Sequence, residues 1–172
     1  LNAGLVLEKS GSGEAARSHL RRYIMLNPQA PEVPAVRQKI AALELLAEEQ
    51  APWRPFVNTY THATQAVERI TLVGRELVLS SVSGATPQHN RRDKAGDVVA
   101  RATIRGKAMP GKWISRSPDP DEIRCFGAVY DNDAEFVIEN QQLVIYISNP
   151  RYQPSTCTIL DRTAMRVRSR MV

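Results

Sequence analysis

Two rows of arginines are the residues of this chain with the clearest capacity for binding. Arg166, Arg168 and Arg170 alternate with other residues near the C-terminus, and Arg101 and Arg105 form a similar row. Alternate residues of a strand share one face, so each row predicts guanidinium groups roughly 6.5–7 Å apart. If the two strands are neighbours, the rows form one positive surface for a phosphate, an acidic polymer or an acidic partner protein. The other interpretation is two solvated strand faces whose charges protect a sheet edge.

The positive charge of the chain is concentrated in its second part. Residues 1–52 carry six basic and six acidic side chains, whereas residues 53–172 carry 17 basic and 12 acidic ones. This excess favours anionic partners, but it also serves solubility. The polar, basic loop 83–97 is a candidate nucleic-acid contact, yet few aromatic residues are present for base stacking. We therefore expect a disordered loop there, and a protein partner, acidic in character, rather than nucleic acid.

Cys125 and Cys157 are the only cysteines of the sequence. Two cysteines without a Cys-x-x-Cys spacing do not predict a zinc site. Each lies in a segment with strand character. They pair in an oxidising compartment if those strands are neighbours, or they remain buried thiols, which is the interpretation we favour. A dyad of either cysteine with His62 or His89 stays open as a hydrolase site. The sequence contains no Gly-x-Ser-x-Gly elbow, P-loop or paired-histidine zinc motif, so we predict no catalytic residue and no cofactor.

Three carboxylates occur at every second residue of the segment 131–135. Asp131, Asp133 and Glu135 have a spacing that resembles the start of a calcium loop. The glycine and the distal glutamate of an EF-hand are missing. The sequence therefore predicts a hairpin turn here, an exposed acidic turn around residues 118–122, and no metal site.

The first 52 residues have the pattern of a helical unit. The predicted helices cover residues 1–10, 14–25 and 34–50. In the second helix, Ala16 and Leu20 belong to one apolar stripe at helical spacing. The prolines of the segment 52–55 end helical structure. They divide the chain into a helical domain, 1–52, and a second domain, 53–172.

Residues 1–28 resemble one tetratricopeptide (TPR) repeat without its first residues. The matching positions are Gly4, Gly11, Ala16, Leu20 and Pro28. Tyr23 departs from the family, which usually has a small residue there. The helix over 34–50 resembles the capping helix that follows a final repeat. The resemblance implies a TPR-like helical hairpin plus capping helix that binds a peptide or protein; the alternative is an unrelated helical hairpin.

After residue 55 the pattern changes to short apolar runs separated by turn residues. The predicted strands cover 68–73, 76–81, 97–106, 111–115, 123–130, 135–139, 143–148, 156–160 and 164–171. Residues 57–67 fit either a further strand or a short helix. This pattern predicts a mainly antiparallel β-barrel or β-sandwich, and hence an α+β protein. Gly111-Lys112-Trp113 resembles the Gly-x-Trp of lipocalins, although that family has the motif on its first strand.

These features together predict a non-catalytic protein–protein interaction and assembly module, a TPR-type scaffold joined to a β-rich docking domain, within a larger bacterial complex. The alternatives are a lipocalin-like ligand-binding barrel and a hydrolase with a Cys/His site. No window approaches ~18 consecutive apolar residues, so we predict no transmembrane helix. Cytoplasm and bacterial cell envelope (periplasm) both stay open, because a segment before Leu1 would carry any targeting signal.

Overall fold

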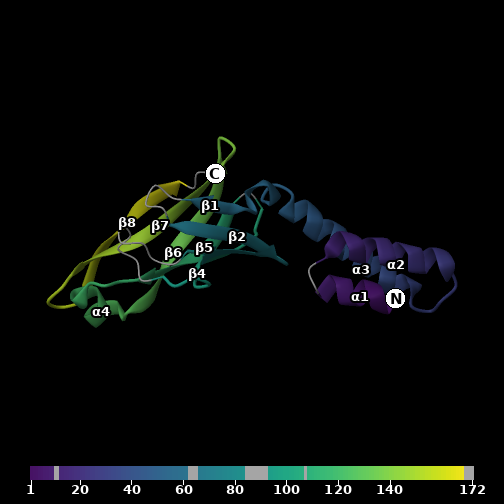
Figure 1. Ribbon diagram of the computed structural model, residues 1–172, viewed down its shortest axis with the longest axis horizontal. Helices are drawn as coiled ribbons and strands as arrows, with labels where there is room; N and C mark the ends of the chain where they lie inside the picture. The colour runs from purple at the N-terminus through teal and green to yellow at the C-terminus, as the bar shows by residue number, and fades with distance from the viewer. Residues whose placement is uncertain (10–11, 62–65, 84–92, 107, 169–172) are drawn as a thin grey trace. The chain divides into compact units, whose positions relative to one another are not determined.

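The computed structural model divides the chain into two compact units, Leu1–Pro52 and Trp53–Val172 (Figure 1). Residues 10–11, 62–65, 84–92, 107 and 169–172 lie outside the described part of the structure. The described residues form four α-helices and one antiparallel sheet of eight strands, which is not closed. The protein therefore belongs to the α+β class, as the sequence predicts.

Three helices form the N-terminal unit, at the predicted positions. They are α1 (Asn2–Lys9), α2 (Gly13–Leu26) and α3 (Val33–Gln50). Ala16 and Leu20, on the apolar stripe of α2, are fully buried against apolar side chains of α3. Gly4 of α1 lies so close to α2 that an added Cβ would meet the Leu20 side chain at 2.9 Å. A larger residue at Gly4 would therefore force α1 and α2 apart.

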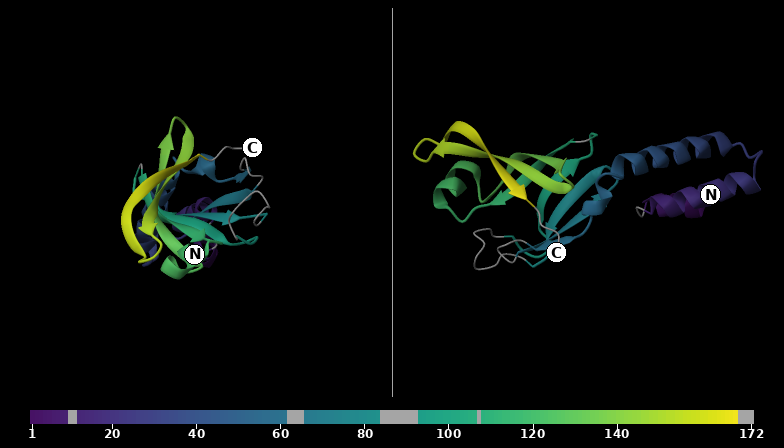
Figure 2. Two further views of the ribbon diagram at one scale, coloured as in Figure 1. Left: turned by 90° about the vertical axis from the view of Figure 1, so that its left-hand side faces the viewer. Right: turned by 90° about the horizontal axis from the view of Figure 1, so that it is seen from above.

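The C-terminal unit contains one sheet whose strands follow one another in space as they do in the chain. Every neighbouring pair is antiparallel. The strands are β1 (Thr59–Thr61), β2 (Val67–Val73), β3 (Glu76–Ser81), β4 (Val98–Thr103), β5 (Ala108–Arg116), β6 (Val129–Glu139), β7 (Gln142–Gln153) and β8 (Thr158–Arg168). A 3-10 turn, η1 (Arg54–Phe56), precedes the sheet, and α4 (Pro120–Phe126) lies between β5 and β6 in the chain. Figure 2 shows that the sheet is strongly curved.

One face of this sheet, which we call the inner face, carries the core of the C-terminal unit. Along β6, Ala134 and Phe136 are buried on the inner face, whereas Asp133 and Glu135 are exposed on the outer face. Gly111 permits the close approach of β4 and β5, because an added Cβ would lie 2.2 Å from a backbone oxygen of β4. The period of two residues along each strand thus separates core from solvent.

Two hairpin turns fall where the sequence predicts them. Gly74, with φ of 58°, joins β2 to β3, and Asn140 and Gln141, with φ of 49° and 60°, join β6 to β7. Both central residues of the β6–β7 turn have positive φ, and in the β2–β3 turn the first one does; both are geometries of two-residue hairpin turns whose twist matches that of the flanking strands. The four predicted strands around these turns, 68–73, 76–81, 135–139 and 143–148, each lie within an observed strand.

The prediction of a strand over 123–130 is wrong, because the chain forms α4 up to Phe126. The Asp119 side chain caps this helix by accepting hydrogen bonds from the backbone N–H groups of Asp121 and Glu122. Pro120 occupies the first turn, where its missing N–H costs no hydrogen bond. The local capping chemistry therefore overrides the strand character of the residues that follow.

Two further predictions for this unit are wrong. Segment 131–135 is not a hairpin turn but the middle of β6, since a spacing of two residues is also the period of a strand. Segments 156–160 and 164–171 are not two strands, because β8 runs without a break from Thr158 to Arg168. β7 and β8 therefore form one long hairpin.

Candidate functional site

The two arginine rows do not form one surface. Arg101 lies on β4, and Arg166 and Arg168 lie on β8, but β5, β6 and β7 separate these two strands. Arg105 lies beyond the end of β4, and Arg170 lies outside the described residues. The continuous basic surface required β4 beside β8. The sheet order contradicts that arrangement, because each strand pairs with the next one in the chain.

A strip of carboxylates on β6 lies between the two arginine rows. Asp131, Asp133 and Glu135 are all exposed on the outer face. The Lys112 ammonium donates a hydrogen bond of 2.5 Å to Asp133, and this lysine lowers the pKa of the Asp133 carboxyl below its usual value. The outer face therefore alternates between basic and acidic strands rather than presenting charge of one sign.

Arg166 is held by neighbours on the outer face. Its guanidinium pairs with the Glu139 carboxylate and lies 5.8 Å from the centroid of the Tyr146 ring. The Tyr146 hydroxyl in turn donates a 2.5 Å hydrogen bond to Glu139. Exposed contacts of these two kinds stabilise a fold by roughly 0.5–1 kcal/mol each. Arg166 therefore links β8 to side chains of β6 and β7, in addition to contributing surface charge.

β8 is a long, exposed edge strand. It spans 11 residues and, within the described part of the chain, pairs only with β7. Three of its apolar side chains are well exposed: Ile159 at 43%, Leu160 at 56% and Met165 at 45%. The opposite edge, β1, spans only 3 residues. A long edge strand presents a row of free N–H and C=O groups, so β8 is the side of the sheet best suited to pair with another chain.

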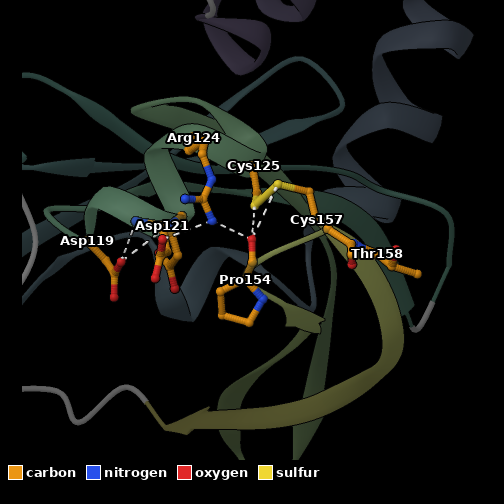
Figure 3. Close-up of a disulfide and its surroundings, with 9 residues drawn as sticks. Asp119, Asp121, Arg124, Cys125, Pro154, Cys157 and Thr158 are labelled. Carbon is orange, nitrogen blue, oxygen red and sulfur yellow. Dashed lines mark hydrogen bonds and ion pairs between the residues drawn. A yellow bond between two sulfur atoms is a disulfide. The ribbon is translucent and has the colours of Figure 1, made fainter.

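The two cysteines form a disulfide, so the prediction of buried free thiols is wrong. Cys125 lies on α4, and Cys157 lies in the turn between β7 and β8, where its φ is 56°. Their Cα atoms are 5.1 Å apart and their sulfurs are bonded (Figure 3). Both residues are partly exposed rather than core residues. The bond ties α4 to the tip of the β7–β8 hairpin.

Pro154 strengthens the same junction. Its carbonyl oxygen accepts a hydrogen bond from the Arg124 guanidinium and lies 3.7 Å from the Cys125 sulfur (Figure 3). The sulfur contact is not a hydrogen bond, because a disulfide sulfur carries no proton. Arg124 also forms a 3.0 Å ion pair with Asp121, one turn earlier on α4. The position of α4 against the hairpin is therefore fixed by the disulfide and by the hydrogen bond from Arg124 to Pro154.

A hollow of about 610 Å³ opens between α4 and the neighbouring end of the inner face. We call it the α4 pocket. Its walls come from β5, the segment after β5, α4, β6, β7 and β8. The lining residues are Trp113, Ser115, Arg116, Ser117, Pro118, Asp119, Glu122, Tyr130, Asn149, Pro150 and Met165. Its volume lies within the range of small-molecule sites, which is roughly 300–1,000 Å³.

Hydrogen bonds organise the polar wall of the α4 pocket. Asn132, which is fully buried, donates to the Ser115 hydroxyl at 2.9 Å. The Tyr130 hydroxyl donates to the Glu122 carboxylate at 3.2 Å. Burial, with a further contribution from Glu122, raises the pKa of Tyr130 above its ordinary value, so its hydroxyl remains a donor at neutral pH. The wall is thus pre-arranged with the Glu122 carboxylate facing the hollow.

Arg116 belongs to a separate ionic cluster at the edge of the pocket. Its guanidinium lies 2.8 Å from the buried Asp93 carboxylate and 3.4 Å from Asp97. It also donates to the Val98 carbonyl at 3.1 Å. Two carboxylates and a carbonyl therefore surround this cation.

Sequence reasoning missed the α4 pocket. The lining side chains come from four separate stretches of the chain, within 113–122 and at 130, 149–150 and 165, and share no motif, so spacing along the chain does not reveal them. One signal was present, because Asp119 followed by Pro120 and Glu122 is the pattern of a helix start. That signal locates the helix that forms one wall.

The other sequence candidates give no site. His62 and His89 of the candidate Cys/His dyad lie outside the described residues, and the two cysteines are bonded to each other. Within the ranges that the structure describes, no three histidine, cysteine or acidic residues group in a way that would hold a metal ion. A search of the same ranges for a helix long and apolar enough to cross a membrane finds none.

The sequence matches no protein-family model, no curated protein is significantly similar to it, and no solved structure matches it.

Proposed function

We propose that this protein is a non-catalytic interaction and assembly module. In this proposal the N-terminal unit is the end of a TPR-type scaffold, and the C-terminal unit docks a partner protein. The observation that carries the proposal is the exposed, 11-residue edge of β8. Strand addition joins an extended segment to such an edge through main-chain hydrogen bonds, and the neighbouring side chains give specificity.

The side chains of β8 define the partner segment. Arg162 and Arg166 lie on the outer face beside the free edge, where Arg166 pairs with Glu139 and Arg162 interacts electrostatically with Asp133. An added strand would place every second side chain next to these arginines, where carboxylates complement them. Met165, on the inner face, would contact the alternate side chains. The expected partner is therefore an extended segment that is acidic on one face and apolar on the other.

The packing of the N-terminal unit supports the TPR part of the proposal. Repeats of this type need a small residue where their two helices approach each other, and Gly4 occupies such a position against Leu20. α3 covers the buried stripe of α2, which is the role of a capping helix after a last repeat.

For the sheet we propose an incompletely closed barrel rather than a two-layer sandwich. One continuous strand order and a single curved sheet support this view (Figure 2). A lipocalin-like barrel fits less well, because Gly111 and Trp113 lie on β5 and not on a first strand, and the α4 pocket is open and partly polar.

The docking proposal is tested in two steps. A photo-crosslinking amino acid at Thr163 on β8 captures the partner in native cells, with Thr103 on β4 as the matched control position. The purified partner is then titrated against Arg162→Glu and against Arg101→Glu. We expect Arg162→Glu to weaken binding by about tenfold or more, since like charges across an interface are strongly unfavourable. Crosslinking only from Thr103, or equal losses in the two variants, would contradict docking at β8.

A further inference from the structure

The charges that line the α4 pocket do not balance. Arg116 is already surrounded by two carboxylates, at 2.8 and 3.4 Å. The Asp119 carboxylate is used as the cap of α4, where it accepts two backbone hydrogen bonds. Glu122 differs from both, because its contact among the described residues is the neutral hydroxyl of Tyr130 at 3.2 Å, with no cation beside it. Of the groups that line the α4 pocket, this carboxylate attracts a cationic ligand most strongly, because no cation of the described residues lies beside it.

The rest of the wall is aromatic and apolar. Trp113 and Tyr130 contribute ring surfaces, Met165 a thioether, and Pro118 and Pro150 apolar rings. Aromatic faces attract cations through their quadrupole, and a thioether packs readily against alkyl groups. A ligand that satisfies both kinds of wall carries a positive charge on an apolar stem.

We propose that the α4 pocket binds an organic cation, namely an ammonium or guanidinium group on an alkyl stem, with Glu122 as the charge partner. Trp113 and Tyr130 contact the stem or the face of the cation. The site shares Met165 with the β8 edge, but its charge partner Glu122 lies on α4, and the proposal does not depend on the docking function. The cation is supplied either by a free amine or by a lysine or arginine side chain of another protein, and the recognition chemistry is the same.

Other classes of ligand fit the same walls less well. An anion would meet Asp119 and Glu122 while Arg116 is already engaged. A bare divalent metal ion prefers several oxygen ligands, and within the described ranges no group of three suitable side chains is present. A neutral polar ligand would leave the charge of Glu122 uncompensated, and it serves as the control in the test.

The test titrates the full chain with butylammonium and, separately, with 1-butanol, and follows the two tryptophan indole N–H signals by NMR. N-acetyl-lysine methylamide and its norleucine counterpart form the second pair of probes. We expect the cationic member of each pair to shift the Trp113 signal and bind on the order of tenfold or more tightly than its neutral counterpart. Tighter binding of the lysine derivative than of butylammonium assigns the site to a protein side chain, and the reverse order assigns it to a free amine.

Two variants of equal charge make the test specific. Glu122→Gln keeps the shape of the side chain and removes its charge, whereas Glu135→Gln removes the same charge from the outer face of β6. We expect Glu122→Gln to lose about tenfold or more in affinity for butylammonium and Glu135→Gln to bind as the unchanged protein does. Equal binding of butylammonium and 1-butanol, equal losses in the two variants, or no shift of the Trp113 signal at millimolar probe would each overturn the proposal.

Discussion

Replacing Cys125 and Cys157 together with serine removes the covalent link between α4 and the β7–β8 hairpin. The two cysteines are 32 residues apart in the chain, and the closed loop contains all of β6 and β7. A cross-link of this loop length restricts the unfolded chain enough to stabilise the native state by about 3–4 kcal/mol in the chain-entropy model. For a unit of this size, a loss of that magnitude lowers the melting temperature by about 15 °C.

Urea unfolding of the oxidised protein, the reduced protein and the double-serine variant measures this loss. We expect the reduced protein and the variant to share one lower midpoint, since both lack the same bond. The oxidised protein, prepared in an oxidising compartment, should have a mass lower by the two hydrogens that are lost when the bond forms. Two freely alkylated thiols in that native protein, or a midpoint unchanged by reduction, would refute the reasoning.

Three further predictions concern packing, charge and pH. Gly111→Ala should destabilise the C-terminal unit by roughly 1–3 kcal/mol, because the new Cβ would lie 2.2 Å from a backbone oxygen. Gly13→Ala is the control, because its Cβ would meet nothing within 4 Å and stability should change little. Urea unfolding midpoints of the two variants measure the difference. Arg116→Met should cost about 3 kcal/mol because it removes the cation beside the buried Asp93 carboxylate. Arg151→Met breaks an exposed pair and should cost less than about 1 kcal/mol; similar losses in thermal unfolding would contradict the distinction. The pKa of Tyr130 is raised in the folded protein, so its protonated hydroxyl stabilises the fold below a pH of about 10. This stabilisation is lost as the pH rises through the pKa of the folded state. An alkaline absorbance titration should show a tyrosine that ionises above its ordinary pKa, and Tyr130→Phe should remove it.

The local parts of this fold were predictable from the sequence, and the parts that depend on distant contacts were not. The stripe through Ala16 and Leu20 gives the second helix, and the turn at Gly74 gives the first hairpin, since each depends on residues close together in the chain. α4 was missed although Asp119 and Pro120 carry the signal of a helix start. The apolar residues that follow them favour a strand, and this pattern led to the wrong prediction.

The candidate sites depended on strand order, which no local pattern contains. Arg101 and Arg166 could share a surface only if β4 and β8 were adjacent, and the spacing of residues does not give the strand order. The disulfide required a turn that brings Cys157 next to a helix, and the α4 pocket required four distant stretches of the chain to converge. Each of these features follows from antiparallel pairing along the whole sheet, a consequence of tertiary packing rather than of residue spacing.

The central claim is that the edge of β8 accepts a strand from a partner protein. Amide hydrogen exchange of this chain, alone and in its native complex, tests that claim directly, because strand addition engages the backbone N–H groups of the edge. The account predicts slower exchange in the complex across residues 158–168, with no change in β2 and β3. Unchanged exchange along β8, with protection elsewhere in the chain, would contradict it.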